Sequence, residues 1–208
     1  MRRIIEAFSR CRIVPVVAIE RAADAPALAR ALLAGGVGVA EITFRTAAAA
    51  EAIARIAKEV PDMLVGAGTV RSTEQVRQAV AAGAQFVVAP AFSPAVCAFC
   101  AQGEVPVFPG CATPTEMEAA IALGLTHLKF FPAEQAGGAA YLKAMASVFP
   151  EVKFMPTGGI SAKNLREYLD LPNVLACGGS WMCSPQRIAA QDWATITKLC
   201  KESICNAR

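Results

Sequence analysis

The sequence predicts an α/β protein folded as an eight-stranded (β/α)8 barrel, with residues 1–208 forming a single domain that begins with a short helix. Short apolar runs alternate with longer segments of helical spacing, as in a parallel sheet, and the count of eight runs favours the barrel. Apolar residues make up 55% of the 208 residues, as expected when helices cover both faces of such a sheet. The runs are Ile13–Ile19, Val37–Phe44, Leu64–Val70, Phe86–Pro90, Val105–Gly110, Thr126–Phe131, Val152–Gly159 and Val174–Ser180.

The segments between these runs carry the spacing and the end signals of helices. Val76 and Val80 lie four residues apart, so they share one helix face. Thr113 stands directly before Pro114, the order of a cap residue and a proline at the first helical position. Ser161 is the cap that we expect for the next helical segment along the chain.

An open, doubly wound sheet is the alternative architecture for alternating strands and helices. Such a sheet usually carries a GxGxxG motif after its first strand when it binds a dinucleotide, and this sequence has none there. No linker, low-complexity tract or second domain is visible. The closed barrel is therefore the preferred interpretation.

Charge and hydropathy exclude two classes of partner. A net charge of +3, without a dense stripe of Lys and Arg, does not predict nucleic-acid binding. The longest uncharged stretch, residues 85–103, is interrupted by Pro90 and Pro94 and does not predict a membrane span. Glu6 and Ser9 break the apolar start of the chain too early for a signal peptide, so we expect a short amphipathic helix and a cytoplasmic protein.

Eight cysteines include one CxxC pair, Cys97 and Cys100. A structural zinc site needs a second ligand pair at matching spacing, and none follows. Disulfides are rare in cytosolic proteins, so we interpret these residues as buried free thiols. The sequence predicts neither a metal nor a cofactor.

The most informative polar residue is Lys129, which lies among Leu128, Phe130 and Phe131 inside a predicted strand. Both faces of a barrel strand are covered, which leaves such a lysine little access to water. Desolvation disfavours the ammonium form, and a neutral amine is what attack on a ketone requires. From the pattern alone, a lysine that extends its amine to solvent at the strand end is an equally good interpretation.

A second polar group ends the second predicted strand. Glu41, Thr43 and Arg45 alternate along the strand, so their side chains point to the same side. A carboxylate and a guanidinium would then meet near the mouth of the barrel, as part of an active site or as a structural ion pair. His127, the one histidine, shares the parity of Lys129, but a lone strand histidine is more often structural and has no part in the predicted mechanism.

Two glycine pairs end the last two predicted strands, Gly158-Gly159 and Gly178-Gly179, and Ser180 follows the second pair. Barrels frequently bind phosphate at this position through backbone amides, which glycine allows to approach an anion closely. One pair alone is usually a turn. Two pairs at neighbouring strand ends predict a phosphate site.

Taken together, these motifs resemble those of a known family, the aldolases of 2-keto-3-deoxy-6-phosphogluconate (KDPG) and 4-hydroxy-2-oxoglutarate (KHG). The resemblance extends along nearly the whole length of the sequence. The resemblance implies a metal-independent class I aldolase on an eight-stranded barrel, assembled as a homotrimer. It implies cleavage of KDPG to pyruvate and glyceraldehyde 3-phosphate, with activity on KHG as well. The segments that carry the resemblance are Glu41–Thr46, Val65–Val70, Pro109-Gly110, Lys129–Glu134, Pro156–Ile160 and Gly178–Trp181.

The resemblance also implies roles for individual residues. Lys129 would form the Schiff base and Glu41 would transfer protons, while Arg45 and Thr69 would hold the carboxylate of pyruvate. The residues implied to line the pocket are Pro90, Phe131 and Thr157, and those implied to hold the phosphate are Gly158, Gly159 and Ser180. The sequence departs from the family at Ala91, where a glycine often follows the proline, and its methyl group is expected to narrow the pocket beside Pro90 or to tilt the loop.

Two other classes of function remain open. A sugar-phosphate isomerase or epimerase that forms no covalent intermediate would share the phosphate site but would not need Lys129. A barrel that only binds sugar phosphates would have no use for a buried amine beside a carboxylate. The sequence does not determine the preference between KDPG and KHG.

Overall fold

The computed structural model describes residues 1–207, so Arg208, the last residue of the expected domain, lies outside the described part. All eight expected strands are present, several of them shorter than the apolar runs that predicted them. The strands are β1 (Ile13–Val17), β2 (Val39–Thr43), β3 (Leu64–Gly68), β4 (Val87–Val88), β5 (Val107–Phe108), β6 (His127–Phe130), β7 (Lys153–Pro156) and β8 (Cys177–Gly179).

The strands pair in parallel and form a curled arrangement in two sheets. Six strands form one sheet in the order β5-β4-β3-β2-β1-β8, and β6 pairs with β7 in the other. Isolated parallel bridges lie between the sheets, Gly110 with Lys129 on one side and Thr157 with Gly178 on the other. Regular pairing is therefore continuous over six strands rather than over the eight of the expected barrel.

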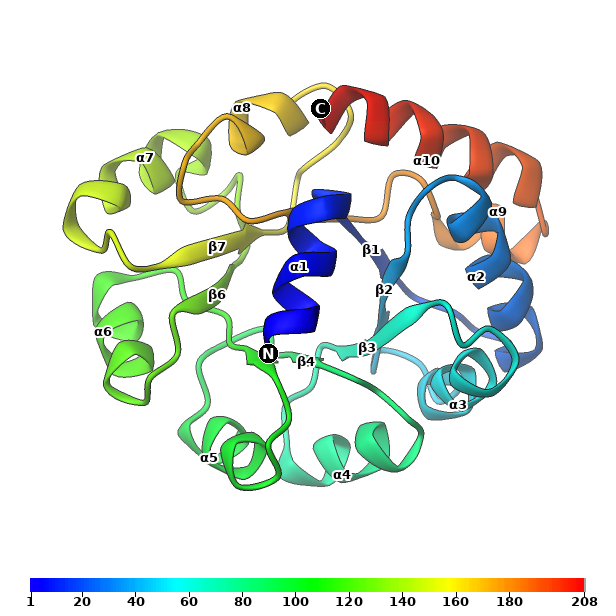
Figure 1. Cartoon of the computed structure of the whole chain (residues 1–208), viewed down its shortest axis with the longest axis horizontal. Coiled ribbons are helices and arrows are strands. Elements are labelled where there is room, and N and C mark those ends of the chain that lie inside the picture. The colour runs from blue at the N-terminus through cyan, green and yellow to red at the C-terminus, as the bar shows by residue number, and fades with distance from the viewer. Residues whose placement is uncertain (208) are drawn as a thin grey trace.

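Helices form an outer layer around the strands, as Figure 1 shows. Each helix between two strands returns the chain to the starting end of the sheet, which parallel strands require. The helices are α1 (Arg2–Cys11), the 3-10 helix η1 (Ala22–Asp24), α2 (Ala25–Ala34), α3 (Ala49–Glu59), α4 (Thr73–Ala81), α5 (Pro94–Gln102), α6 (Pro114–Ala122), α7 (Gly138–Val148), α8 (Leu165–Leu169), α9 (Pro185–Ala189) and α10 (Trp193–Ala207).

Side-chain caps begin several of these helices. Thr113 accepts a hydrogen bond from the amide of Glu116, and the Glu116 side chain bonds back to the Thr113 amide, which confirms the predicted start of α6. The predicted cap Ser161 is wrong. The cap position of α8 is Asn164, because a turn follows Ser161 before the helix begins.

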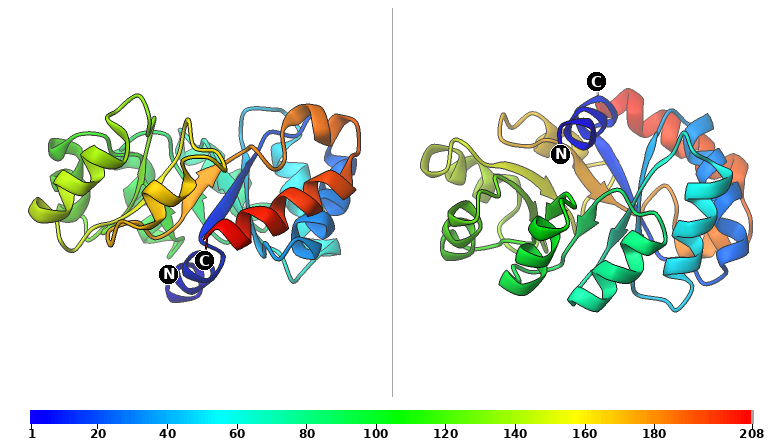
Figure 2. Two further views of the ribbon diagram at one scale, coloured as in Figure 1. Left: turned by 90° about the horizontal axis from the view of Figure 1, so that it is seen from above. Right: turned by 60° about the horizontal axis from the view of Figure 1, so that its bottom comes forward.

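The amphipathic helix α1 covers the end of the sheet at which the strands begin. It lies across the strands at the centre of Figure 1 and projects from one side of the molecule in the left view of Figure 2. Its fully buried Phe8 packs on Phe86 at 5.2 Å and on Phe108 at 5.0 Å between ring centroids. This aromatic cluster fills the space inside the strands, so the opposite end, where the strands finish, is left for a site.

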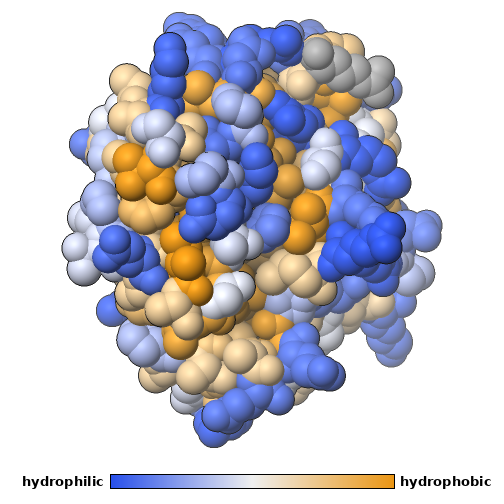
Figure 3. All heavy atoms as spheres, turned by 60° about the vertical axis from the view of Figure 1, so that its left-hand side comes forward, coloured by the Kyte–Doolittle hydropathy of each residue, from blue (hydrophilic) through white to orange (hydrophobic). Residues whose placement is uncertain are grey.

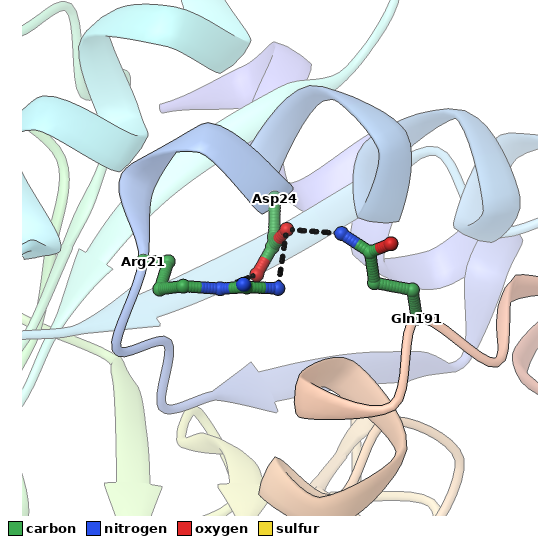
Figure 4. Close-up of polar contacts among 3 residues, drawn as sticks. All are labelled: Arg21, Asp24 and Gln191. Atoms are coloured by element: carbon green, nitrogen blue, oxygen red, sulfur yellow. Dashed lines mark hydrogen bonds and ion pairs between the residues drawn. The ribbon is translucent and has the colours of Figure 1, made fainter.

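A buried carboxylate joins the first and last parts of the chain. Asp24, which is 5% exposed, accepts two hydrogen bonds from Arg21 and one of 2.9 Å from Gln191 (Figure 4). Arg21 precedes η1, and Gln191 lies between α9 and α10. These contacts fix the segment after β1 against the segment after β8, on the side of the molecule where both strands end.

The expected burial of the thiols is confirmed with one exception. Seven cysteines are buried without a disulfide, and Cys205 on α10 is exposed. Within the described part of the chain, none of the helices combines the length and the apolar character needed to traverse a bilayer.

Replacing Phe8 by Ala tests whether α1 is an integral part of the core. Removing a fully buried phenylalanine typically costs about 3–5 kcal/mol, so we expect a corresponding loss in the free energy of unfolding measured with urea. Arg2→Ala on the same helix is the control, since its ion pair with Glu6 is exposed and such pairs contribute less than about 1 kcal/mol. Equal stability of the two variants would show that α1 is not part of the cooperative core.

Candidate active site

A cavity of about 270 Å³ opens where the strands end. Of the predicted site residues, all except Glu41 line it, so residues scattered along the sequence are brought together. The lining residues are Val16, Arg45, Thr69, Pro90, Lys129, Phe131, Thr157, Gly158, Gly159, Ile160, Gly179 and Ser180.

The base of this cavity holds a buried amine and a buried carboxylate. Lys129 Nζ lies 3.8 Å from Glu41 Oε1, and the two residues are 3% and 0% exposed. The same amine lies 5.1 Å from the centre of the Phe131 ring. The interpretation in which Lys129 extends its amine to solvent is therefore wrong, because β6 is covered on both faces.

Glu41 is poorly solvated in this position. Neither of its carboxylate oxygens has a hydrogen-bond partner within residues 1–207. Burial raises the pKa of Glu41 above its ordinary value, while the nearby charges of Lys129 and Arg45 oppose that shift. A carboxyl group with these properties can both accept and return a proton during a reaction.

The position of Glu41 also explains a glycine on the neighbouring strand. A Cβ atom on Gly68 would lie 2.0 Å from Glu41 Oε1, so β3 must end in a residue without a side chain. The next residue, Thr69, adopts a φ of 57°, which is rare for a β-branched side chain. Such strained residues cluster at functional sites, and Thr69 lines the cavity.

Arg45 is held by a residue that the sequence did not place in the site. Thr43 is fully buried and accepts a hydrogen bond of 3.0 Å from Arg45 Nε, while its own hydroxyl donates to the carbonyl of Val17. The signal was present in the alternation of Glu41, Thr43 and Arg45. Val16 and Ile160 also line the cavity, and their apolar side chains carried no signal that distinguished them from the core.

Three glycines of the two pairs, Gly158, Gly159 and Gly179, line the cavity with Ser180, and these four residues form what we call its upper wall. Gly158 and Gly159 have φ angles of 101° and 80°, a conformation that other residues rarely adopt. Gly178 is required for a different reason, since a Cβ there would lie 2.3 Å from Thr157 Oγ1. Ser180 lines the cavity beside Gly179, so the two predicted pairs do meet at one place.

Two other expectations concern residues near the cavity. His127 is half-buried at the beginning of β6 and is not among the lining residues. Burial lowers the pKa of His127, and the charge of Lys153 adds to this effect. Ala91 is exposed and also absent from the lining, so its methyl group does not narrow the cavity.

Comparison with known proteins agrees with this geometry. The family model for KDPG and KHG aldolase matches residues 4–199. The 2-dehydro-3-deoxy-phosphogluconate aldolase of Treponema pallidum is 52% identical, with 98% of this chain and 97% of that protein covered.

Solved structures give the same result. The KDPG aldolase of Legionella pneumophila, crystallised with pyruvate captured as a covalent carbinolamine intermediate, has a TM-score of 0.92 at 43% identity, with 95% of this chain and 96% of that chain covered. The aldolase of Zymomonas mobilis, crystallised with 3-phosphoglycerate, has a TM-score of 0.89 at 42% identity, with 98% and 96% covered. The match of the family model and the identity to these relatives show that this chain, with its buried lysine beside a carboxylate, belongs to the KDPG and KHG aldolase family.

Proposed function

We propose that the protein cleaves KDPG to pyruvate and glyceraldehyde 3-phosphate through a Schiff base on Lys129, and that it also acts on KHG. The observation that carries this proposal is the buried pair of Lys129 and Glu41 at the base of the cavity, 3.8 Å apart. An amine held out of water beside a group that can accept its proton is suited to attack a ketone.

The first half of the reaction forms the imine. Glu41 first accepts a proton from the Lys129 ammonium group, 3.8 Å away. The neutral Nζ then attacks C2 of the keto acid to form a carbinolamine. Glu41 returns the proton to the C2 hydroxyl group, which leaves as water and gives the protonated imine. Arg45 and Thr69 hold the substrate carboxylate, and the hydrogen bond from Arg45 to Thr43 orients the guanidinium for this. Phe131, Thr157 and Pro90 contribute to the wall of the cavity around the substrate.

The second half breaks the carbon–carbon bond. The imine cation draws the electron pair of the C3–C4 bond, while Glu41 takes the C4 hydroxyl proton directly or through a water molecule. Glyceraldehyde 3-phosphate leaves, and an enamine remains on Lys129. Glu41 then returns its proton to C3, and hydrolysis of the pyruvyl imine releases pyruvate and restores both groups.

The phosphate group of KDPG binds at the upper wall in this proposal. Gly158, Gly159 and Gly179 present a backbone without side chains there, and Ser180 adds a hydroxyl. Backbone amides are effective ligands for an anion, and glycine lets them approach it closely.

The two alternative functions are disfavoured by the same pair. A sugar-phosphate isomerase without a covalent intermediate would not need the Lys129 amine beside Glu41. A protein that only binds sugar phosphates would retain a buried charged pair that is costly to desolvate and serves no purpose in binding.

We also infer that residues 1–208 form one cytoplasmic domain, that the eight strands close into a single (β/α)8 barrel, and that the enzyme is a homotrimer. The bridges between the two sheets support closure. Buried free thiols suit a reducing compartment.

The surface over α6 and α7 supports the trimer. Apolar patches are visible on this face of the molecule in Figure 3. Leu123, directly after α6, and Val148, the last residue of α7, are 51% and 60% exposed. Such surfaces suit contacts between subunits.

Borohydride trapping tests the covalent step. With pyruvate present, reduction of the imine should inactivate the enzyme and add the mass of one lactyl group, measured on the intact protein. Lys129→Arg should abolish both effects, because a guanidinium does not form the imine. Peptide mapping provides the control: the added mass on Lys153, near the beginning of β7, would exclude the proposed role of Lys129.

Replacing Glu41 by Gln tests the proton-transfer role. The variant should still form the imine but should exchange the methyl protons of pyruvate about 10²–10⁴-fold more slowly in deuterated water, as followed by NMR. Exchange at the wild-type rate would remove Glu41 from the mechanism.

The raised pKa of Glu41 adds a pH dependence to the same comparison. As a base Glu41 must be ionised, so the wild-type kcat/KM should fall with decreasing pH at a value above 4.5, the ordinary pKa of this group. The contribution of Glu41 to the free energy of unfolding changes with pH in the opposite direction to the activity. It is present below the unfolded pKa and is lost as pH rises through the raised folded pKa, so Glu41→Gln should make the free energy of unfolding less dependent on pH in that window.

Substrate preference tests the phosphate site. The wild type should have a higher kcat/KM for KDPG than for its unphosphorylated counterpart, because binding energy from a remote phosphate also positions the reacting carbons. Ser180→Ala should reduce kcat/KM for KDPG and leave the trapping of pyruvate unchanged. Equal values for the two substrates in the wild type would mean that the glycine pairs are only turns.

A further inference from the structure

The loop of residues 158–160, at the proposed phosphate site, has both of its glycine carbonyls occupied. The carbonyl of Gly158 accepts a hydrogen bond of 3.1 Å from the amide of Glu134. The carbonyl of Gly159 accepts one of 3.2 Å from Asn164 Nδ2. The loop is therefore held from two directions, by the segment after β6 and by the residue that precedes α8.

These two contacts determine where the loop amides point. A trans peptide carries its carbonyl and its N–H on opposite sides, so fixing one carbonyl aims the next amide the other way. The amides of Gly159 and Ile160 follow the two occupied carbonyls, and neither donates a hydrogen bond to any residue from 1 to 207. Both residues line the cavity. Two unpaired donors beside a cavity are the groups that an anionic ligand would use.

Asn164 is in an unusual arrangement for its position. An asparagine at the cap of a helix normally accepts a hydrogen bond from an amide in the first helical turn. Asn164 makes no such bond to α8. Its side chain reaches back instead, accepting from the amide of Ser161 at 2.8 Å while donating to Gly159. The Asn164 side chain therefore stabilises the loop rather than the start of α8.

The side of the loop near β6 is held by a second pair of side chains. A Cβ on Gly159 would lie 2.3 Å from Glu134 Cγ, so the Glu134 side chain packs directly against this glycine. The hydroxyl of Tyr168 on α8, which is fully buried, donates to Glu134 Oε1. Asn164 and Tyr168 therefore connect α8 to opposite sides of the same loop.

We propose that Asn164 is a positioning residue for phosphate recognition, which holds the carbonyl of Gly159 so that the loop amides face the cavity, with Glu134 and Tyr168 holding the other side. This inference rests on the proposed function, because it assigns those amides to the phosphate of KDPG. Asn164 does not touch the reacting atoms. It acts through the direction of the peptide groups.

The test compares kcat/KM for KDPG and for KHG, which lacks a phosphate, in the wild type and in Asn164→Ala. A hydrogen bond to an oriented group is worth about 1 kcal/mol or somewhat more, so we expect the ratio of KDPG to KHG to fall about fivefold to tenfold. The loss should appear mainly in KM for KDPG, and pyruvate trapping by borohydride should be unchanged. Asn206→Ala is the matched control, since Asn206 is exposed on α10 and should leave the ratio at the wild-type value.

Two further variants separate positioning from folding. Asn164→Asp keeps an acceptor for the Ser161 amide but has no donor for the Gly159 carbonyl, so it should lose at least as much of the ratio as the alanine variant. Tyr168→Phe should lower the ratio by a smaller factor, because the packing of Glu134 remains. The inference is wrong if the wild type prefers KDPG and the Asn164 variants keep that preference, or if both substrates decline equally. A wild type without any preference would overturn the phosphate site itself, and this inference with it.

Discussion

Parallel pairing of the strands is the constraint on which the rest of the structure depends. Because all strands run in the same direction, their carboxyl ends lie on one side of the molecule. Residues in or closely after β1, β2, β3, β4, β6, β7 and β8 meet there and line the cavity. The opposite side is occupied by α1, whose Phe8 packs among Phe86 and Phe108. One end is therefore filled with aromatic side chains, and the other remains open as a cavity.

Within that cavity, burial decides the chemistry. The carboxylate of Glu41 has lost its contact with water and has no hydrogen-bond partner among the described residues, and this raises its pKa. Leaving two charged groups desolvated is costly unless each stabilises the other, so the pair with Lys129 is kept close. The surrounding backbone is adapted to the pair, as the missing side chain of Gly68 beside Glu41 shows. The charged pair and the strand ends that surround it are thus parts of one arrangement.

Recognition at the upper wall follows a different principle. In the proposed phosphate site the binding groups are backbone amides together with the Ser180 hydroxyl, and further side chains act by orienting the peptide groups. Asn164 and Glu134 hold the two carbonyls of the glycine pair, and Tyr168 fixes Glu134 from α8. The conformation that only glycine adopts readily leaves the loop dependent on these neighbours for its shape.

The sequence by itself determined the strand and helix alternation, the position of Lys129 and Glu41 on buried strands, and the glycine pairs, because each is a local pattern of period or composition. It did not determine the role of Thr43, the apolar lining by Val16 and Ile160, or the start of α8 at Asn164 rather than Ser161. The first two features depend on contacts between separate strands, such as that between β1 and β2. The start of α8 depends on the Asn164 side chain, which bonds back to Ser161 and Gly159 instead of to the helix. The division of regular pairing into six strands and two was also decided by tertiary structure, since the register and curvature of neighbouring strands arise only when they pack together.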